Sequence, residues 1–429
     1  MKVSIKQKAL MTALEKGAVA TTSNEAQADS SNLSVLVRSI KITADKHFTI
    51  ESSTNMISSK YTVAVNDENG ITVNEGGSVM VPASEMINWV KLQNPDAVIA
   101  LNLQKLDKPI LIQPQSIEDV EVTSVKKTGI LKMTSKDPMK TNSKWELDAF
   151  DVESIKSVNY KEKSAKKCFD VKARALKEGL SKVSFAALAK DYEQTYNCVS
   201  FQFWDGKAFL QTTDTKHCAL YQIPKDDISD IDGSATMLLI PSSVLELAVK
   251  ISDDENSLSF SYHQDKSNNP RIFISQPGLE IRLAGADEDK KASYHSGKLL
   301  VDRDSTFLAE IPKISLEKVL MITSIVNKVS VLFTFRKEDK NLVIKAISEE
   351  SKYAPLMEKI SIPELTKDAR FVCSPNHLLE ALKVIKSDEI KVSIANNQKN
   401  TLMIGKDDPN FYHFDILKDS PIYKDAKEV

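Results

Sequence analysis

The stretch VPASEMINWVK at residues 81–91 decides the fold, because the chain contains it three times. It returns as IPSSVLELAVK at residues 240–250 and, more loosely, as CSPNHLLEALK at residues 373–383. Each copy runs from an apolar strand end through a proline into a helix whose last turn holds a lysine. In the first two copies the proline stands at the first turn, where a helix tolerates it best. This recurrence predicts three structurally equivalent domains in one chain.

The first helix of each predicted domain repeats in the same way. IKQKALMTALEK at residues 5–16 aligns without a gap on VKARALKEGLSK at residues 171–182, and IPKISLEKVLMI at residues 311–322 is a weaker third copy. Each helix follows a short strand-like segment, and its apolar residues recur at helical spacing. We therefore expect each domain to open with a strand and a helix.

Strand-like runs of alternating residues fill the rest of each domain, for example LSVLVRSIKI, CVSFQFW and SVLFTFR. The resulting order is approximately β-α-β-β-β-α-β-β-β. It predicts an α+β fold with antiparallel sheets and two helices on one face. The predicted domains are residues 1–155, with an insertion at about 104–127, residues 168–295 and residues 305–429, and residues 156–167 form a linker.

The composition fits a folded globular chain, since 41% of the 429 residues are apolar and 27% are charged. The formal net charge of −2 excludes DNA binding through bulk basicity, but 57 Lys and Arg residues leave room for a local basic surface. No apolar run reaches the ~18 residues of a membrane span, and the first residues lack the apolar core of a signal peptide, so we expect an intracellular protein. The four cysteines lie far apart, which argues against a zinc site or a disulfide framework.

Lysines recur on the outward faces of the predicted helices. Lys91, Lys250 and Lys383 each follow the last residue of an apolar stripe, about 100° round from it. Spaced lysines that contact phosphates without reading bases suit sequence-independent binding of duplex DNA. The plain alternative is that exposed helix positions often carry lysine and are merely solvated. The further basic residues assigned to this surface are Lys6, Lys8, Lys16, Lys172, Arg174, Lys182, Lys313 and Lys318.

With these repeats the chain resembles the bacterial beta sliding clamps, the beta subunits of DNA polymerase III. The resemblance rests on MKVSIKQKALMTAL, NLSVLVRSIKI, VPASEMINWV, TTDTKHCALYQIP, IPSSVLELAVKI and the threefold repeat. It implies three clamp domains per chain and a head-to-tail homodimer, a ring whose helices line a hole around duplex DNA. Such a ring slides on weak, screened phosphate contacts. The resemblance thus implies a cytoplasmic, nucleoid-associated processivity factor with no catalytic residues, cofactor, metal or membrane contact.

The resemblance also implies an apolar cleft between the second and third domains that binds short peptides of DNA polymerase and of the clamp loader. Family members form one wall with Thr-Asp-Gly-His-Arg-Leu, which corresponds to residues 213–218 here with only the first two residues identical. The other wall is the family's carboxyl terminus, from which FDILKDSPIYKDAKEV departs. The expected cleft residues are Thr213, Thr215, His217, Cys218, Ile362 and either Ile416 with Leu417 or Pro421 with Ile422.

Family DNA contacts near the strands of the second domain correspond to Lys190, Tyr192 and Tyr196. The early arginine loop of the family is replaced by VATTSNEAQADSS, so one expected DNA contact is missing. These departures leave a rival interpretation open, in which a clamp-like ring with a changed or lost peptide cleft serves as a non-replicative scaffold.

An enzyme is less well supported by the sequence. The chain has no phosphate-binding glycine loop and no HExxH or GxSxG motif. The acidic groups that could hold Mg²⁺, near Asp226, Asp253 and Asp287, lie in turn-like contexts. The six histidines show no paired spacing, so each is expected to be a surface or partly buried side chain.

Overall fold

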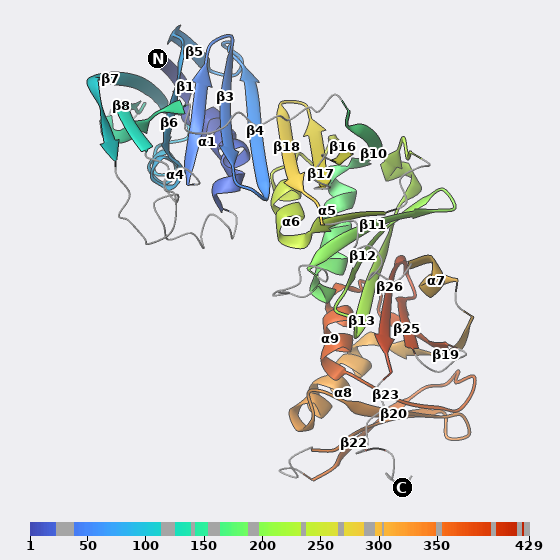
Figure 1. The fold of residues 1–429 in the computed structure, drawn as a ribbon. Coiled ribbons are helices and arrows are strands. Elements are labelled where there is room, and N and C mark those ends of the chain that lie inside the picture. The colour runs from blue at the N-terminus through green and yellow to red at the C-terminus, as the bar shows by residue number, and fades with distance from the viewer. Residues whose placement is uncertain are drawn as a thin grey trace. The chain divides into compact units, whose positions relative to one another are not determined.

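A similar order of helices and strands occurs three times along the chain (Figure 1). The sequence predicted three strands between the two helices of each repeat. The structure has four there in every repeat, and the first two repeats each add one further short strand, Ile71–Glu75 and Ile228–Ser229. Lys190, Tyr192, Tyr196, Pro421 and Ile422 lie outside the residues that the structure describes. This structure, a computed structural model, describes residues 1–22, 38–112, 125–138, 142–152, 164–187, 197–232, 237–264, 270–286, 297–302, 304–348, 354–395, 400–417 and 423.

The first repeat opens with a strand and a helix, continues with a run of short strands, and closes with a second helix and three strands. Its elements are β1 (Lys2–Lys6), α1 (Gln7–Gly17), η1 (Val19–Thr22), β2 (Ser39–Ala44), β3 (His47–Ser53), β4 (Ile57–Ala64), β5 (Ile71–Glu75), β6 (Gly77–Pro82), α4 (Ala83–Lys91), β7 (Val98–Ile112), β8 (Val125–Lys136) and β9 (Asn142–Phe150).

The second repeat follows the same order. Its elements are β10 (Lys166–Lys172), α5 (Ala173–Val183), η3 (Ser184–Ala186), β11 (Cys198–Trp204), β12 (Lys207–Thr213), β13 (His217–Ile223), η4 (Lys225–Asp227), β14 (Ile228–Ser229), β15 (Met237–Pro241), α6 (Ser242–Lys250), β16 (Ser257–Gln264), β17 (Pro270–Gln276) and β18 (Leu279–Ala284).

The third repeat is preceded by the short helix α7 (Gly297–Val301). Its elements are β19 (Ser305–Pro312), α8 (Lys313–Val326), β20 (Val331–Arg336), β21 (Asn341–Ala346), β22 (Leu356–Ser361), β23 (Ala369–Cys373), α9 (Pro375–Val384), β24 (Glu389–Ala395), β25 (Asn400–Gly405) and β26 (Asp408–Ile416).

Two groups of hydrogen-bonded strands recur in every repeat. One group joins the first strand to the last three, in the orders β1-β7-β8-β9, β10-β16-β17-β18 and β19-β24-β25-β26. The other joins the four middle strands, in the orders β4-β3-β2-β6, β13-β12-β11-β15 and β22-β21-β20-β23. The pairings within these groups are antiparallel. The predicted α+β fold with antiparallel sheets is therefore confirmed.

The chain divides into two compact units. One unit comprises residues 1–173 and 243–285, and the other comprises residues 174–242 and 286–429. Strands of the second repeat belong to both: the group that begins with β10 lies in the first unit, and the group that begins with β13 lies in the second. The division into three domains, which the sequence repeats indicate, differs from these two compact units and remains a prediction.

Within each unit, one strand ladder joins two successive repeats. In the first unit β18 of the second repeat pairs with β4 of the first, beginning at Ile57↔Leu283. In the second unit β26 of the third repeat pairs with β13 of the second, beginning at His217↔Asp415. We call these ladders the first junction and the second junction. They join equivalent strands, so residue numbers in β4 and β13 correspond one to one from these starting pairs.

The helices bury the apolar stripes that the sequence pattern predicts. Leu10 and Leu14 of α1 and Met86 and Val90 of α4 lie in one core cluster with sheet residues of the first repeat. In the third repeat the equivalent side chains of α8 and α9 are also buried. Apolar residues three or four positions apart lie on one helix face, so the opposite face stays in solvent.

Of the predicted insertion in the first repeat, residues 104–112 belong to β7 and residues 125–127 to β8, while residues 113–124 lie outside the described part of the chain. Strands β7 and β8 pair out to Ile112↔Val125, past an irregularity between Lys105 and Ile110. No helix in the described ranges is long and apolar enough to span a membrane.

Candidate functional site

The helix lysines of the predicted DNA surface differ in their accessibility. Lys91, Lys250 and Lys383 are exposed near the ends of α4, α6 and α9, as the helical spacing from the apolar stripe predicts. Lys313 is half-buried, and its Nζ donates a hydrogen bond to the carbonyl oxygen of Ile385 at 2.5 Å. Contact between DNA and any of these basic residues remains a prediction. Among the other assigned residues, Lys6, Lys8, Arg174 and Lys318 are exposed, whereas Lys172 is half-buried.

Lys182 corrects the sequence prediction, because it is only 3% exposed and forms an ion pair with Asp408 of β26. Its Nζ also lies over the rings of Tyr221, at 5.5 Å, and Phe411, at 5.9 Å. The carboxylate balances the charge of this lysine, and the two aromatic rings cover its ammonium group, so it is not accessible to a phosphate of DNA. Lys182 therefore supports the second junction instead of a DNA surface.

Lys16, which aligns with Lys182 in sequence, occupies the same place in the first junction. Its Nζ lies 2.6 Å from Asp253 Oδ1 and 5.1 Å from the centroid of the Tyr61 ring. Tyr61 corresponds to Tyr221 in the strand register. The side chain of Lys16 is 12% exposed and that of Asp253 is 49% exposed, so this ion pair is accessible to water. A direct phosphate contact by Lys16 would have to compete with this ion pair.

A polar hollow of about 390 Å³ lies in the second unit, near His217, one of the residues expected in the peptide cleft. It lies between the β12–β13 turn and the start of α9. Its lining residues are Phe185, Ala187, Asp214, Lys216, His217, Lys328, Val329, Ser374, Asn376, His377 and Glu380. Charged and polar side chains thus outnumber apolar ones, in contrast to the apolar cleft that the resemblance implies.

Of the predicted peptide-cleft residues, His217 alone lines this hollow within the described chain. Thr213 is buried in the turn, where its hydroxyl donates to the carbonyl oxygen of His217 at 2.7 Å and accepts from the amide of Thr215 at 3.1 Å. Cys218 is buried, with Gln211 Nε2 at 3.2 Å from its sulfur. Ile362 is fully buried, so it supports the core of the third repeat. Leu417 is half-buried, and the side chain of Ile416 lies outside the described atoms.

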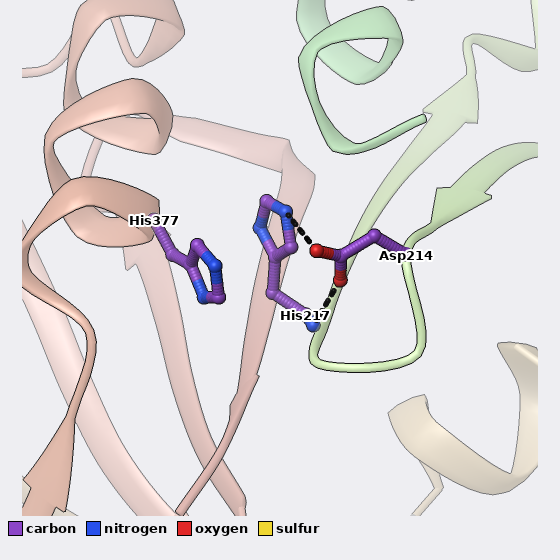
Figure 2. Close-up of side chains that lie close together, drawn as sticks. All are labelled: Asp214, His217 and His377. Carbon is purple, nitrogen blue, oxygen red and sulfur yellow. Dashed lines mark hydrogen bonds and ion pairs between the residues drawn. The ribbon is translucent and has the colours of Figure 1, made fainter. Parts of the chain in front are cut away.

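Asp214, His217 and His377 line this hollow, and the buried residues His413 and Asp415 contact the two histidines; we call these five residues the His–Asp cluster. Asp214 holds the β12–β13 turn, since its Oδ1 accepts from the amide of His217 at 2.8 Å, and its Oδ2 lies 3.6 Å from His217 Nε2 (Figure 2). The rings of His217 and His377 are stacked, with centroids 4.0 Å apart. On the far side of these rings, His217 Nδ1 lies 3.2 Å from His413 Nε2, and His377 Nδ1 lies 3.0 Å from Asp415 Oδ1.

Burial keeps two imidazoles of the cluster neutral. Burial lowers the pKa of His217 to about 4, with a smaller contribution in the same direction from His377, while Asp214 opposes it. Burial likewise lowers the pKa of His413, again reinforced by the neighbouring histidines. Desolvation penalises the charged form of an imidazole, so both rings are uncharged at pH 7.

The His–Asp cluster could not be recognised from local sequence, because its histidines come from three separate elements: β13, α9 and β26. His217 and His413 are 196 positions apart and meet only because β13 pairs with β26. The internal repeat holds the one available signal. Aligning the copies of the opening stretch shows that His377 stands where the second copy has Val244.

Comparisons of the whole structure with solved structures find one fold. The chain matches the DNA polymerase sliding clamp of Bacillus subtilis with a TM-score of 0.73 at 15% identity, covering 98% of this chain and 99% of that one. It matches the DNA polymerase III beta chain of Streptococcus pneumoniae with a TM-score of 0.73 at 16% identity, covering 98% and 100%. The DNA polymerase III subunit beta of Pseudomonas aeruginosa gives 0.69 at 15% identity, again over 98% and 100%. No protein-family model and no curated protein sequence matches the chain. The chain therefore has the fold of the beta sliding clamps of DNA polymerase III.

Proposed function

We propose that the chain is a DNA sliding clamp, in which two copies close head to tail into a ring around duplex DNA and tether a DNA polymerase and other partners. The ring would act in the cytoplasm, at the nucleoid, by topology instead of by catalysis, and it would need no cofactor. The similarity of the fold to the sliding clamps supports the ring-forming architecture. The strand junctions of this chain support closure of the ring, and its exposed lysines support contact with DNA.

The repetition of the junctions is the observation that carries the proposal. Two junctions in one chain join the last strand of one repeat to the corresponding middle strand of the repeat before it, as β18 with β4 and β26 with β13. The strands that would form a third junction are β9 and β22. Within the described sheets β22 ends its sheet, and β9 meets β6 only at Met80↔Phe150. A second chain in head-to-tail orientation would pair its β22, which ends a sheet, with the part of β9 beyond the single pairing to β6.

The DNA contact is supported by the exposed lysines at equivalent helix ends. Lys91, Lys250 and Lys383 are exposed in all three repeats, and a dimer would present six of these ends. Screened contacts of this kind are individually weak and interchangeable, which suits sliding. A basic surface made from equivalent positions would also explain binding in a chain whose formal net charge is −2.

Ring closure is tested first by sedimentation equilibrium. We expect a species of twice the 47.7 kDa chain mass at micromolar concentration. Loading onto nicked circular DNA should then give a complex that survives high salt and is lost when the circle is cut. A strictly monomeric chain that dissociates equally from circles and linear DNA would contradict the proposal.

The lysine helices are tested by the triple variant Lys91→Glu, Lys250→Glu and Lys383→Glu. We expect it to dimerise normally and to lose retention on circular DNA. A matched control reverses three other exposed lysines, Lys46, Lys105 and Lys207, which lie off the helices. Equal loss in both variants would show a nonspecific charge effect and remove the helices from the proposed DNA surface.

A second candidate function is a clamp-like scaffold that forms the ring but recruits different partners. The polar lining of the hollow favours it, because an apolar peptide would leave Asp214, Lys216 and Glu380 without water or a counter-charge. Fluorescence anisotropy with a polymerase-type clamp-binding peptide distinguishes the two functions. Micromolar binding that is lost when His217 is replaced supports the polymerase clamp, and no binding at millimolar peptide supports the scaffold.

A further inference from the structure

The His–Asp cluster replaces an apolar core that the same chain keeps at the first junction. In the strand register His217 corresponds to Ile57, His413 to Ile281 and Asp415 to Leu283. These three apolar counterparts are at most 1% exposed, as an ordinary sheet junction requires. The second junction therefore keeps the backbone pairing but exchanges buried apolar side chains for titratable ones.

The two remaining members of the cluster show the same exchange. His377 of α9 corresponds to Val244 of α6, which is also buried. Asp214 corresponds to Thr54, whose hydroxyl accepts from the amide of Ile57 at 3.1 Å and so forms the same turn. A neutral threonine thus suffices to build this turn. The carboxylate of Asp214, like the imidazoles, is more than the fold needs.

The hydrogen bonds within the His–Asp cluster leave one of its buried polar atoms unpaired among the described residues. His413 is fully buried, and its Nδ1 has no hydrogen-bond partner among the described residues. A buried polar network with an unpaired member is less favourable than the apolar packing it replaces. The stability of the second junction therefore does not account for the five residues that differ from the first junction. Binding of a ligand would account for them.

Three possible metal-ligand atoms lie close together in the cluster. One donor atom each from Asp214, His217 and His377 lies within 4.8 Å of the other two. Asp214 Oδ2 and His217 Nε2 are already 3.6 Å apart, close to the separation of about 3.4 Å between two ligands of a tetrahedral zinc ion. Each ring is held at Nδ1, His217 by His413 and His377 by Asp415, which leaves Nε2 for a ligand.

We propose that Asp214, His217 and His377 bind one divalent transition metal ion of the zinc class at the edge of the hollow. Two imidazoles and a carboxylate are a donor set for Zn²⁺, which takes three protein ligands and an open fourth position. Asp415 and His413 act as positioning residues, because hydrogen bonds at Nδ1 orient ligating histidines. The stacked rings imply that one of them turns on binding, since a metal lies in the plane of each imidazole that ligates it.

The ion would connect two repeats inside the second unit. Asp214 and His217 belong to the turn between β12 and β13 of the second repeat, and His377 belongs to the first turn of α9 in the third (Figure 2). Binding would fasten that turn to the helix and fix one wall of the hollow. The open coordination position would face the hollow, where water or a donor atom of a docked partner completes the shell. This inference does not depend on DNA binding or ring closure.

The test uses the full chain, stripped with chelator and then dialysed against ZnCl₂, with bound metal measured by mass spectrometry and affinity by competition with a chromophoric chelator. The decisive variants take residues from the chain's own first junction, Asp214→Thr and His377→Val, so the turn and the helix keep a known compatible side chain. His47→Gln is the matched control, because it removes an exposed histidine outside the cluster.

We expect one Zn²⁺ per chain for the unaltered protein and for His47→Gln, and a more than ~100-fold loss of affinity for Asp214→Thr and His377→Val. Asp415→Asn should weaken binding by about 10- to 100-fold, as outer-shell changes do. Co²⁺ used as a spectroscopic probe should give the visible bands of a tetrahedral nitrogen and oxygen site, and those bands should vanish in Asp214→Thr even if that variant is less stable. Equal zinc binding by all variants, or no zinc retained by the unaltered chain, would overturn the proposal.

Discussion

The two junctions have the same backbone and opposite chemistry. At the first junction a partly solvated lysine pair, Lys16 with Asp253, lies beside an apolar strand face that begins at Ile57. At the second junction the equivalent lysine, Lys182, is buried with a different partner, Asp408, and the equivalent strand face begins at His217 and carries the His–Asp cluster. Equivalent positions in one fold can therefore serve packing in one place and ligand chemistry in another, because strand pairing alone maintains the register.

The largest expected effect is a difference between the two lysine pairs. Lys182→Met keeps the apolar stem but leaves Asp408 buried without its counter-charge, which should destabilise the second unit by about 3 to 5 kcal/mol. Lys16→Met should cost under about 1 kcal/mol, because Asp253 is half in water. Urea unfolding, with hydrogen exchange read separately at β13 and β4, measures both. Equal losses would show that burial does not distinguish the junctions.

Acid should weaken the second junction more than the first. Because burial lowers the pKa of His217 to about 4, the unfolded chain binds the extra proton between about pH 6.5 and pH 4. The stability that neutral His217 contributes is present above about pH 6.5 and is lost as the pH falls toward 4, by at most roughly 3.5 kcal/mol.

The comparison is made in metal-free buffer between the unaltered chain and His217→Ile, the residue of the first junction. The variant should lose less stability across this pH range, as measured by urea midpoints at each pH. Parallel pH profiles for the two proteins would mean that other groups, mainly carboxylates, govern the acid response.

A smaller effect is expected in the turn that carries Asp214 and His217. Thr215 has a positive φ of 74°, a left-handed conformation that is strained for a β-branched residue. Thr215→Gly should raise stability by about 0.5 to 1 kcal/mol, since relief of strain exceeds the added backbone entropy of glycine. Thermal unfolding checks this, with Thr212→Gly as the contrasting strand position, and a lower melting temperature for Thr215→Gly would show that the turn is not strained.

The smallest effect concerns Cys218, whose counterpart in the first junction is Ser58. Burial raises the pKa of the Cys218 thiol to about 12, so the reactive thiolate is scarce at pH 8. Iodoacetamide should leave Cys218 unmodified in the native chain and label it after unfolding, as peptide mass spectrometry can show. Rapid native labelling would mean that the second junction opens frequently.

Local sequence patterns predicted the repeated elements well. Leu10, Leu14, Met86 and Val90 follow helical spacing, and they are buried in the structure. The exposure of Lys91 follows from the same periodicity, because one step round the helix from a buried stripe reaches solvent. These properties depend on neighbours within one or two turns, so the sequence carries them directly.

The candidate site could not be predicted in this way. Lys182 has the same local context as an exposed helix lysine, yet its partner Asp408 is 226 positions away. His217, His377 and His413 each read as isolated histidines, because no local spacing relates a turn, a helix start and a distant strand.

The sequence by itself determined the threefold repeat, the two helices of each repeat, the antiparallel sheets and the helix faces that are buried, since these follow from short-range periodicity and from the copies of VPASEMINWVK. Only the tertiary structure decided which lysines remain free and where the histidines meet. Those outcomes depend on the pairing of β13 with β26, which brings distant residues into one register. Burial at that junction then sets the charge state and the ligand chemistry of the side chains it gathers.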